Sequence, residues 1–188
     1  TTFGESPILA ALVAQGKLPP VEDRLPDPSD VMVVPVVDQI GEYGGTWRRA
    51  FTGPNDGQNA DRIMMDEDLK FDLNGVDVIP NIAKGWEVSN DGLTYTLYLR
   101  KGMKWSDGKP FTAHDFVFAY RDMLLNKESN PFPPEYLKTG GKLGRLEALD
   151  DTTIRYLVSC IIRLFWTMKS GFTTRARATR TAAVSSIT

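Results

Sequence analysis

Cysteine and histidine are almost missing from this 188-residue chain, which has one of each, Cys160 and His114. One cysteine excludes an internal disulfide and a zinc site built on cysteines, and one histidine excludes a site built on a histidine pair. Apolar runs stay well below the roughly 20 residues that a helix needs to cross a bilayer, so we expect no membrane span. The sequence indicates no metal and no cofactor.

Acidic residues are missing from the end of the chain, where Asp151 is the last of them. Residues 1–151 hold 16 basic and 24 acidic side chains, a net charge of −8, whereas the residues after them hold six basic side chains and no acid. An acidic body argues against nucleic acid as the partner. The first residues show no basic segment followed by an apolar one, the pattern of an export signal, so such a signal is absent or has been removed.

The composition that is present, 41% hydrophobic and 24% charged, is typical of a globular domain. Ser6 and Pro7 predict the start of a helix that ends at Gly16, because serine accepts from free N–H groups and proline needs no partner. Five prolines then make residues 17–35 unsuitable for a long helix or a central strand. We therefore expect an extended arm that lies over the surface of another part of the protein.

The middle of the chain predicts short strands. We expect a first strand over residues 46–51, a polar loop over residues 52–57 and a short helix over residues 59–65. A hairpin should then join residues 69–71 to residues 76–79. Leu93, Tyr95, Leu97 and Leu99 alternate with polar or amphipathic residues, which predicts a half-buried antiparallel strand paired with residues 86–88 through the turn at Asp91-Gly92.

The second half predicts one helix and one hairpin. Thr112 and Asp115 have the spacing of a capping box, with aspartate in place of glutamate, at the start of a helix over residues 113–125. Residues 126–141 should form a loop, and residues 143–149 and 152–158 a last hairpin. Helices and strands do not alternate along the chain, so we expect an α+β fold with a mixed or antiparallel sheet and packed helices.

Several polar motifs have ordinary structural interpretations. Lys70 stands where a calcium-binding loop of the EF-hand type needs an oxygen ligand, so the acidic residues around it predict a solvated turn. No serine or cysteine is placed beside His114 by the sequence to act as a nucleophile. Asp107, Asp115 and Asp122 could supply a pair of carboxylates for glycoside hydrolysis, although a turn and a helix cap account for the first two.

A long run resembles the signature of family 5 of the bacterial extracellular solute-binding proteins, the receptors of oligopeptide-type ABC importers. It comprises Pro80-Asn-Ile-Ala-Lys-Gly-Trp-Glu-Val88, Asn90-Asp-Gly-Leu-Thr-Tyr-Thr-Leu-Tyr-Leu-Arg100, Lys104-Trp-Ser-Asp-Gly-Lys-Pro-Phe-Thr-Ala113 and Asp115-Phe-Val117. The resemblance extends over roughly residues 44–157. It implies that the chain holds part of lobe I of a two-lobed receptor, of the class II type found in periplasmic binding proteins, with an inserted subdomain that carries the signature.

The resemblance also implies a function and a site. The protein would capture a solute, an oligopeptide above all, for an ABC transporter permease in the periplasm or at the cell surface, as a monomer peripheral to the membrane. Ligand contacts would come from the loop after the first strand, with Asn55, Asp56 and Gly57 as candidates, and less strongly from Tyr136. The signature residues Trp105, Asp107 and Pro110 would be structural. A chain with one wall of the cleft should bind peptide weakly or not at all.

The chain departs from the family after Val158, where the expected proline-containing segment and helix are replaced by an end rich in arginine, threonine and alanine. A shifted reading frame or a gene fragment would produce such a change. We therefore expect three parts: residues 1–43 as a helix and proline-rich arm, residues 44–158 as the partial lobe, and residues 159–188 as a non-native or disordered tail. A hydrolase acting on saccharide or peptide, and an interaction module with a basic tail, remain the alternatives.

Overall fold

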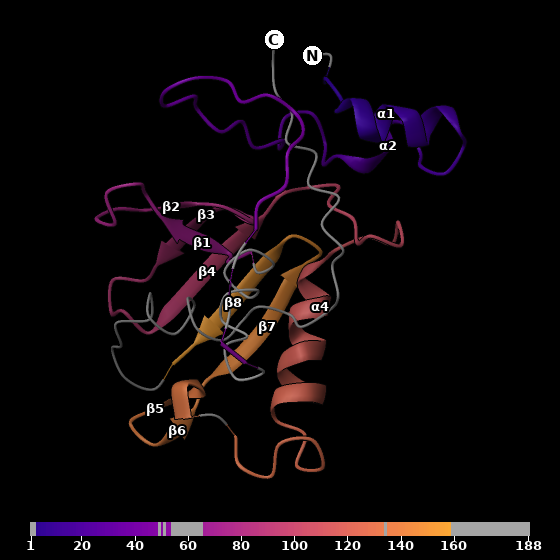
Figure 1. Ribbon diagram of the computed structural model, residues 1–188. Helices are drawn as coiled ribbons and strands as arrows, with labels where there is room; N and C mark the ends of the chain where they lie inside the picture. The colour runs from indigo at the N-terminus through magenta and orange to yellow at the C-terminus, as the bar shows by residue number, and fades with distance from the viewer. Residues whose placement is uncertain (1–2, 49, 51, 54–65, 134, 159–188) are drawn as a thin grey trace.

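The computed structural model describes residues 3–48, 50, 52–53, 66–133 and 135–158. Four antiparallel strands form its main sheet, in the order β3-β4-β8-β7 (Figure 1). They are β3 (Ala83–Val88), β4 (Thr94–Leu99), β7 (Arg145–Asp150) and β8 (Thr153–Leu157). Two of the three hairpins predicted from the sequence lie in this sheet, and the pairing of β4 with β8 joins them.

The alternation predicted for residues 93–100 is confirmed in β4. Tyr95, Leu97 and Leu99 are buried, and the residues between them are partly exposed. The register places Tyr95 opposite Tyr156 and Leu97 opposite Ile154, so two strands far apart in sequence bury the same face. Because side chains alternate along a strand, this register gives the sheet one apolar face and one wetter face.

One helix packs on this sheet and follows the predicted cap. Helix α4 (Ala113–Phe118) begins at the Thr112–Asp115 capping box, in which Asp115 Oδ2 accepts from the backbone N–H of Thr112 at 2.7 Å. Phe116 packs in the same apolar cluster as Leu97, Leu99 and Ile154. In Figure 1, α4 lies alongside β7 and runs on without a break into η1 (Ala119–Leu124).

The last part of the predicted helix differs from an α-helix. Element η1 is π-helical, and the N–H of Leu125 donates to the carbonyl of Tyr120 at 3.0 Å, five residues back. The wider turn still buries Ala119 and Tyr120. The helix expected over residues 113–125 is thus found over residues 113–124, with Leu125 as its C-cap. The change of hydrogen-bond register was not expected, since the spacing of apolar residues does not distinguish these two helix types.

Two small hairpins flank the sheet. Strands β1 (Leu69–Phe71) and β2 (Val78–Pro80) confirm the hairpin expected there. The segment expected to be loop over residues 126–141 contains η2 (Glu135–Leu137), a 3₁₀ turn, and the start of a second hairpin, β5 (Lys138–Thr139) with β6 (Lys142–Leu143). Gly140 and Gly141 turn this hairpin with φ values of 56° and 74°, the paired left-handed conformation of a tight hairpin turn.

The N-terminal prediction is largely confirmed. Helix α1 (Pro7–Ala14) is capped by Ser6, whose Oγ accepts from the N–H of Leu9 at 3.3 Å. The arm after it includes one short helix, α2 (Val21–Arg24), which the proline pattern did not suggest. Val21 and Leu25 pack with Phe3 in a small cluster of their own.

One expected strand is not found. Residues 46–48 and 50 lie in no strand, while Arg49 and Phe51 are outside the described residues. Among the described strands none pairs with this segment, and a strand needs a neighbour to take up its backbone hydrogen bonds. The helix expected over residues 59–65 lies outside the described residues.

Candidate functional site

The ligand-binding residues predicted from the sequence fall at the limits of what the structure describes. Asn55, Asp56 and Gly57 lie outside the described residues, which end on that side at Gly53. Tyr136 lies in η2, immediately before the hairpin β5–β6, and its side chain is outside the described part. The structure therefore places the backbone of one predicted contact residue, and the four together remain a prediction.

The segment around Tyr136 is tied to the sheet by two buried tyrosines. The hydroxyl of Tyr120, on η1, donates to the carbonyl oxygen of Gly144 at 2.5 Å. The hydroxyl of Tyr156, on β8, donates to the carbonyl oxygen of Leu137 at 3.3 Å. The same Leu137 carbonyl accepts the N–H of Gly144 at 3.1 Å, so both ends of the hairpin are fixed at one place.

Packing and burial reinforce these contacts. The rings of Tyr120 and Tyr156 meet edge to face, with their centroids 6.3 Å apart and an interplanar angle of 75°. Leu137, fully buried, completes the cluster with Tyr95 and Val158. Burial raises the pKa of both Tyr120 and Tyr156, and for Tyr156 the neighbouring Tyr120 raises it further, so both hydroxyls remain protonated donors at neutral pH.

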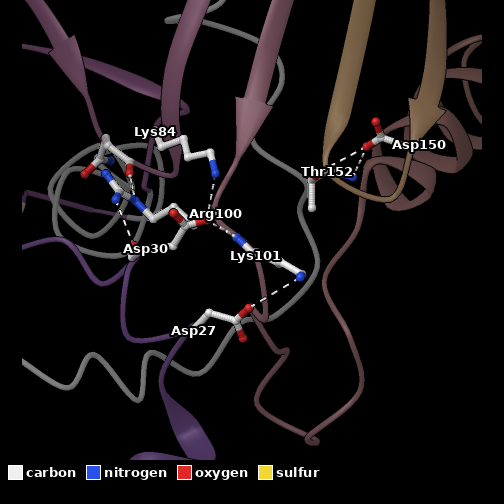
Figure 2. A network of polar contacts seen from close by, with 8 residues as sticks. Asp27, Asp30, Lys84, Arg100, Lys101, Asp150 and Thr152 are labelled. Carbon is white, nitrogen blue, oxygen red and sulfur yellow. Dashed lines mark hydrogen bonds and ion pairs between the residues drawn. The ribbon is translucent and has the colours of Figure 1, made fainter. Parts of the chain in front are cut away.

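A second polar network joins the N-terminal arm to the end of β4. Asp30 Oδ2 accepts from the backbone N–H of Lys101 at 2.7 Å and from Lys84 Nζ at 2.8 Å. Arg100 donates to the carbonyl of Asp30 at 2.9 Å and to that of Asn81 at 2.8 Å. Figure 2 shows Asp30 facing Lys84 and Lys101 from the arm. The hydrogen bond from Lys101, followed by that from Lys84, lowers the pKa of Asp30.

This network holds the arm on the sheet. Sequence reasoning predicted that the arm lies over another part of the protein but did not find its partners. The only available signal was the position of Asp30 among prolines and of Arg100 and Lys101 at the end of a predicted strand. Neither position indicates which residue the other contacts, since 70 residues separate Asp30 from Arg100.

Asp68 is a buried carboxyl that the sequence reasoning missed. Asp68 lies directly before β1 and is 7% exposed, and its backbone carbonyl accepts the N–H of Ala83 at 2.9 Å. Burial, followed by the charge of Glu67, raises the pKa of Asp68 to about 7. Asp68 belongs to an acidic run that looked like a solvated turn, and no sequence pattern marks one member of such a run as buried.

The carboxylates considered for hydrolysis have local structural partners. Asp115 caps α4 and also accepts from Trp105 Nε1 at 3.3 Å. Asp107 accepts from the N–H of Lys109 at 3.0 Å within its own turn, and Asp122 pairs with Arg121 at 2.7 Å. The signature residues Trp105 and Asp107 thus hold the turn before the helix, the structural role that the resemblance implied.

The remaining motifs are also part of local structure. Asp72, considered for calcium, closes its turn by accepting the N–H groups of Val76 at 2.8 Å and Asp77 at 3.2 Å. His114 lies on the surface, 3.5 Å from Asp151 Oδ1. Within the described ranges, no group of three or more histidine, cysteine, aspartate or glutamate side chains could hold a metal ion. No helix among the described residues is long and apolar enough to cross a membrane.

Comparison with known proteins gives one consistent relationship. Residues 77–159 match the family model of the bacterial extracellular solute-binding proteins, family 5 middle region. The periplasmic alpha-galactoside-binding protein of Rhizobium meliloti is 32% identical in an alignment of 178 residues, and the match covers 85% of this chain and 24% of that protein. The chain therefore spans about a quarter of the length of this relative.

Solved structures show the same relationship in three dimensions. An oligopeptide-binding protein OppA superposes with a TM-score of 0.81 and 42% identity, over 92% of this chain and 27% of that one. The periplasmic binding protein MelB of Agrobacterium fabrum C58, solved in complex with stachyose, superposes with a TM-score of 0.58 and 28% identity, over 88% of this chain and 29% of that one. The fold is accordingly a partial lobe of a periplasmic-binding-protein-like receptor.

Proposed function

We propose that this chain, whose residues 77–159 match the model of family 5 of the bacterial extracellular solute-binding proteins, forms part of the solute-binding component of an ABC importer. The observation that carries this proposal is the superposition on OppA, which covers 92% of this chain and 27% of that longer chain. A receptor of this kind binds and releases its solute without making or breaking a covalent bond.

The mechanism proposed is enclosure of the solute between two lobes. Closure around a bound solute creates the shape that a membrane permease can distinguish from the open form. This chain would supply part of one wall, with Asn55, Asp56 and Gly57 offering amide, carboxylate and backbone groups and Tyr136 adding a contact. The partners would be a small solute and the permease, and the protein would act as a monomer in the periplasm or at the cell surface.

For the solute class we propose an oligopeptide, supported by the likeness to OppA. An alpha-galactoside is the second candidate, because the Rhizobium relative is named for such a solute and MelB was solved with stachyose. Both of those matches extend over most of this chain.

The test is an NMR titration of the ¹⁵N-labelled full chain with trialanine and, separately, with stachyose. We expect weak, millimolar binding of the peptide, because one wall buries only part of a solute. The double variant Asn55→Ala/Asp56→Ala should weaken it at least threefold. The matched control Asn74→Ala/Asp77→Ala, with the same residue types in the β1–β2 turn, should leave it unchanged.

The titration distinguishes the two candidate solutes and also tests whether this chain contacts a solute at all. A response to stachyose alone would replace the peptide by a galactoside. A response to neither solute would contradict the solute contacts proposed for this chain, and micromolar or tighter binding would contradict the expectation that it holds one wall of a cleft.

A further inference from the structure

The hairpin that follows Tyr136 is held more firmly than its length predicts. Strands β5 and β6 have two residues each, and isolated hairpins are marginal in water even when they are longer. Here Leu137, directly before β5, is fully buried, and Gly144, directly after β6, donates to the Leu137 carbonyl. External contacts at these two residues, outside the hairpin's own strands, must therefore supply much of its stability.

Those external contacts come from two tyrosine hydroxyls on different elements. Tyr120 reaches Gly144 from η1, and Tyr156 reaches Leu137 from β8. Tyr120 is 5% and Tyr156 is 3% exposed; the Tyr156 hydrogen bond is buried away from competing water, and the Tyr120 hydrogen bond is partly buried. Both η1 and β8 pack in the core of the domain, so the two hydroxyls connect the hairpin β5–β6 to that core.

Gly144 makes the close approach possible. A Cβ atom at Gly144 would overlap the hydroxyl and the ring of Tyr156, so a side chain here would displace the tyrosine. Gly144, the hydroxyls of Tyr120 and Tyr156 and the carbonyl of Leu137 thus pack closely together. Tyr136 precedes Leu137 in the chain, so the backbone of this predicted contact residue is one peptide unit from the anchored carbonyl.

We propose that Tyr120 and Tyr156 are positioning residues for the solute site, which act by fixing the segment from Tyr136 to Gly144 against the sheet and η1. This inference rests on the proposed function, because it assigns Tyr136 to the solute site. The hydroxyls need not touch the solute. Their role is to keep the Tyr136 segment in one conformation before the solute arrives, which lowers the ordering cost of binding.

The test compares Tyr120→Phe, Tyr156→Phe and the double variant in the full chain. Phenylalanine keeps the ring packing and removes only the hydroxyl. Amide hydrogen exchange at Gly144 should become at least tenfold faster in the double variant, while exchange at Leu99, whose N–H donates to Thr152 within the sheet, stays unchanged and shows that the fold persists. The dissociation constant for trialanine, measured by NMR titration, should rise three- to tenfold.

A matched control separates positioning from a general loss of hydroxyl groups. Tyr98 lies on the other face of β4, and its side chain hydrogen-bonds to that of Glu87 on β3. Tyr98→Phe should change neither Gly144 exchange nor the dissociation constant. A double variant with faster Gly144 exchange and unchanged solute binding would overturn the proposal, because the tyrosines would then be merely structural.

The remaining outcomes are also decisive. Unchanged exchange at Gly144 in the double variant would show that the hydroxyls do not anchor the hairpin, and would overturn the proposal whatever the solute does. If the unmodified chain responds to no solute, the proposed solute contacts fail and the positioning role fails with them, while the exchange data still decide whether the anchor exists. The two failures are therefore distinguishable.

Discussion

A Cβ atom at Gly102 would lie 2.5 Å from Oδ1 of Asp27 and 2.9 Å from its backbone nitrogen. Gly102 also has a φ of 78°, a left-handed conformation that favours glycine. The N–H of Asp27 donates to the carbonyl of the preceding Lys101 at 2.9 Å. The N-terminal arm thus packs against the turn after β4 at Gly102, where a side chain larger than that of glycine would not fit.

Gly102→Ala should destabilise the domain by about 2–4 kcal/mol, because backbone strain and a steric clash add together. The matched control is Gly108→Ala, where φ is 85° but a Cβ would meet nothing within 4 Å. This control should cost about 1–2 kcal/mol, the strain alone. Urea denaturation of both variants measures the difference, and equal losses would show that the arm does not press on Gly102.

Asp30→Ala should detach the arm and destabilise the domain by about 2 kcal/mol. The Asp30 carboxylate accepts a charge-assisted hydrogen bond from Lys84 and a hydrogen bond from the backbone N–H of Lys101, and the variant loses both. The pKa of Asp30 is lowered in the native state, so its contribution is fully present above the unfolded value near 3.9 and is lost as pH falls through the lower native value. Limited proteolysis of the arm and acid titration followed by circular dichroism measure both effects.

Asp38→Ala is the control for this variant, since Asp38 lies exposed in the same N-terminal region. It should leave proteolysis and acid stability unchanged. Equal behaviour of the two variants would show that Asp30 does not hold the arm on the sheet.

Asp68→Asn should make the domain more stable at alkaline pH. The native pKa of Asp68 is raised to about 7, whereas the unfolded carboxyl ionises near 3.9, so the native state holds a proton that the unfolded state has lost. Stability should therefore fall as pH rises from about 4 to about 7 and then stay level. The asparagine variant removes this fall and gains up to about 4 kcal/mol relative to the unmodified chain at pH 8.

Urea denaturation over this pH range measures the effect, with Asp77→Asn, an exposed aspartate in the β1–β2 turn, as the control. The control should reproduce the pH dependence of the unmodified chain. A stability profile that stays flat between pH 4 and pH 7 in the unmodified chain would contradict the burial of an ionisable Asp68.

Gly144→Ala should destabilise the domain by about 1–3 kcal/mol, because a methyl group would overpack against Tyr156. Gly85→Ala is the matched control within the sheet, since a Cβ there would meet nothing within 4 Å. Thermal unfolding followed by circular dichroism should show a lower Tm for the first variant and a nearly unchanged one for the second. Two unchanged values would mean that Tyr156 can move aside without cost.

Patterns that a few neighbouring residues specify were readable from the sequence. The alternation through Leu93–Leu99 predicted both the strand and its buried face, and the spacing of Thr112 and Asp115 predicted the start of α4. The π-helical turn of η1 and the hairpin at Gly140-Gly141 were missed. In both cases the apolar pattern was compatible with another local structure, and packing of Tyr120 and Leu137 against β8 selected the one observed.

The candidate site was predicted less well than the fold. The four residues proposed as solute contacts came from the family resemblance, and they remain a prediction. The anchor formed by Tyr120 and Tyr156 had no signal in the sequence, because tyrosines in an amphipathic helix and an alternating strand predict core positions without saying which carbonyl their hydroxyls reach.

Local patterns in the chain specified most of the strands, the hairpins and the helix starts described in this domain, since hydrogen bonding and side-chain alternation within such elements depend on residues close together in the chain. Packing between distant segments was needed for Asp30 to meet Lys84 and Lys101, for Asp68 to be buried and for Tyr156 to reach Leu137. Those relationships join segments distant in sequence, and their energies depend on solvent exclusion, which exists only after the sheet, helix and arm have packed together.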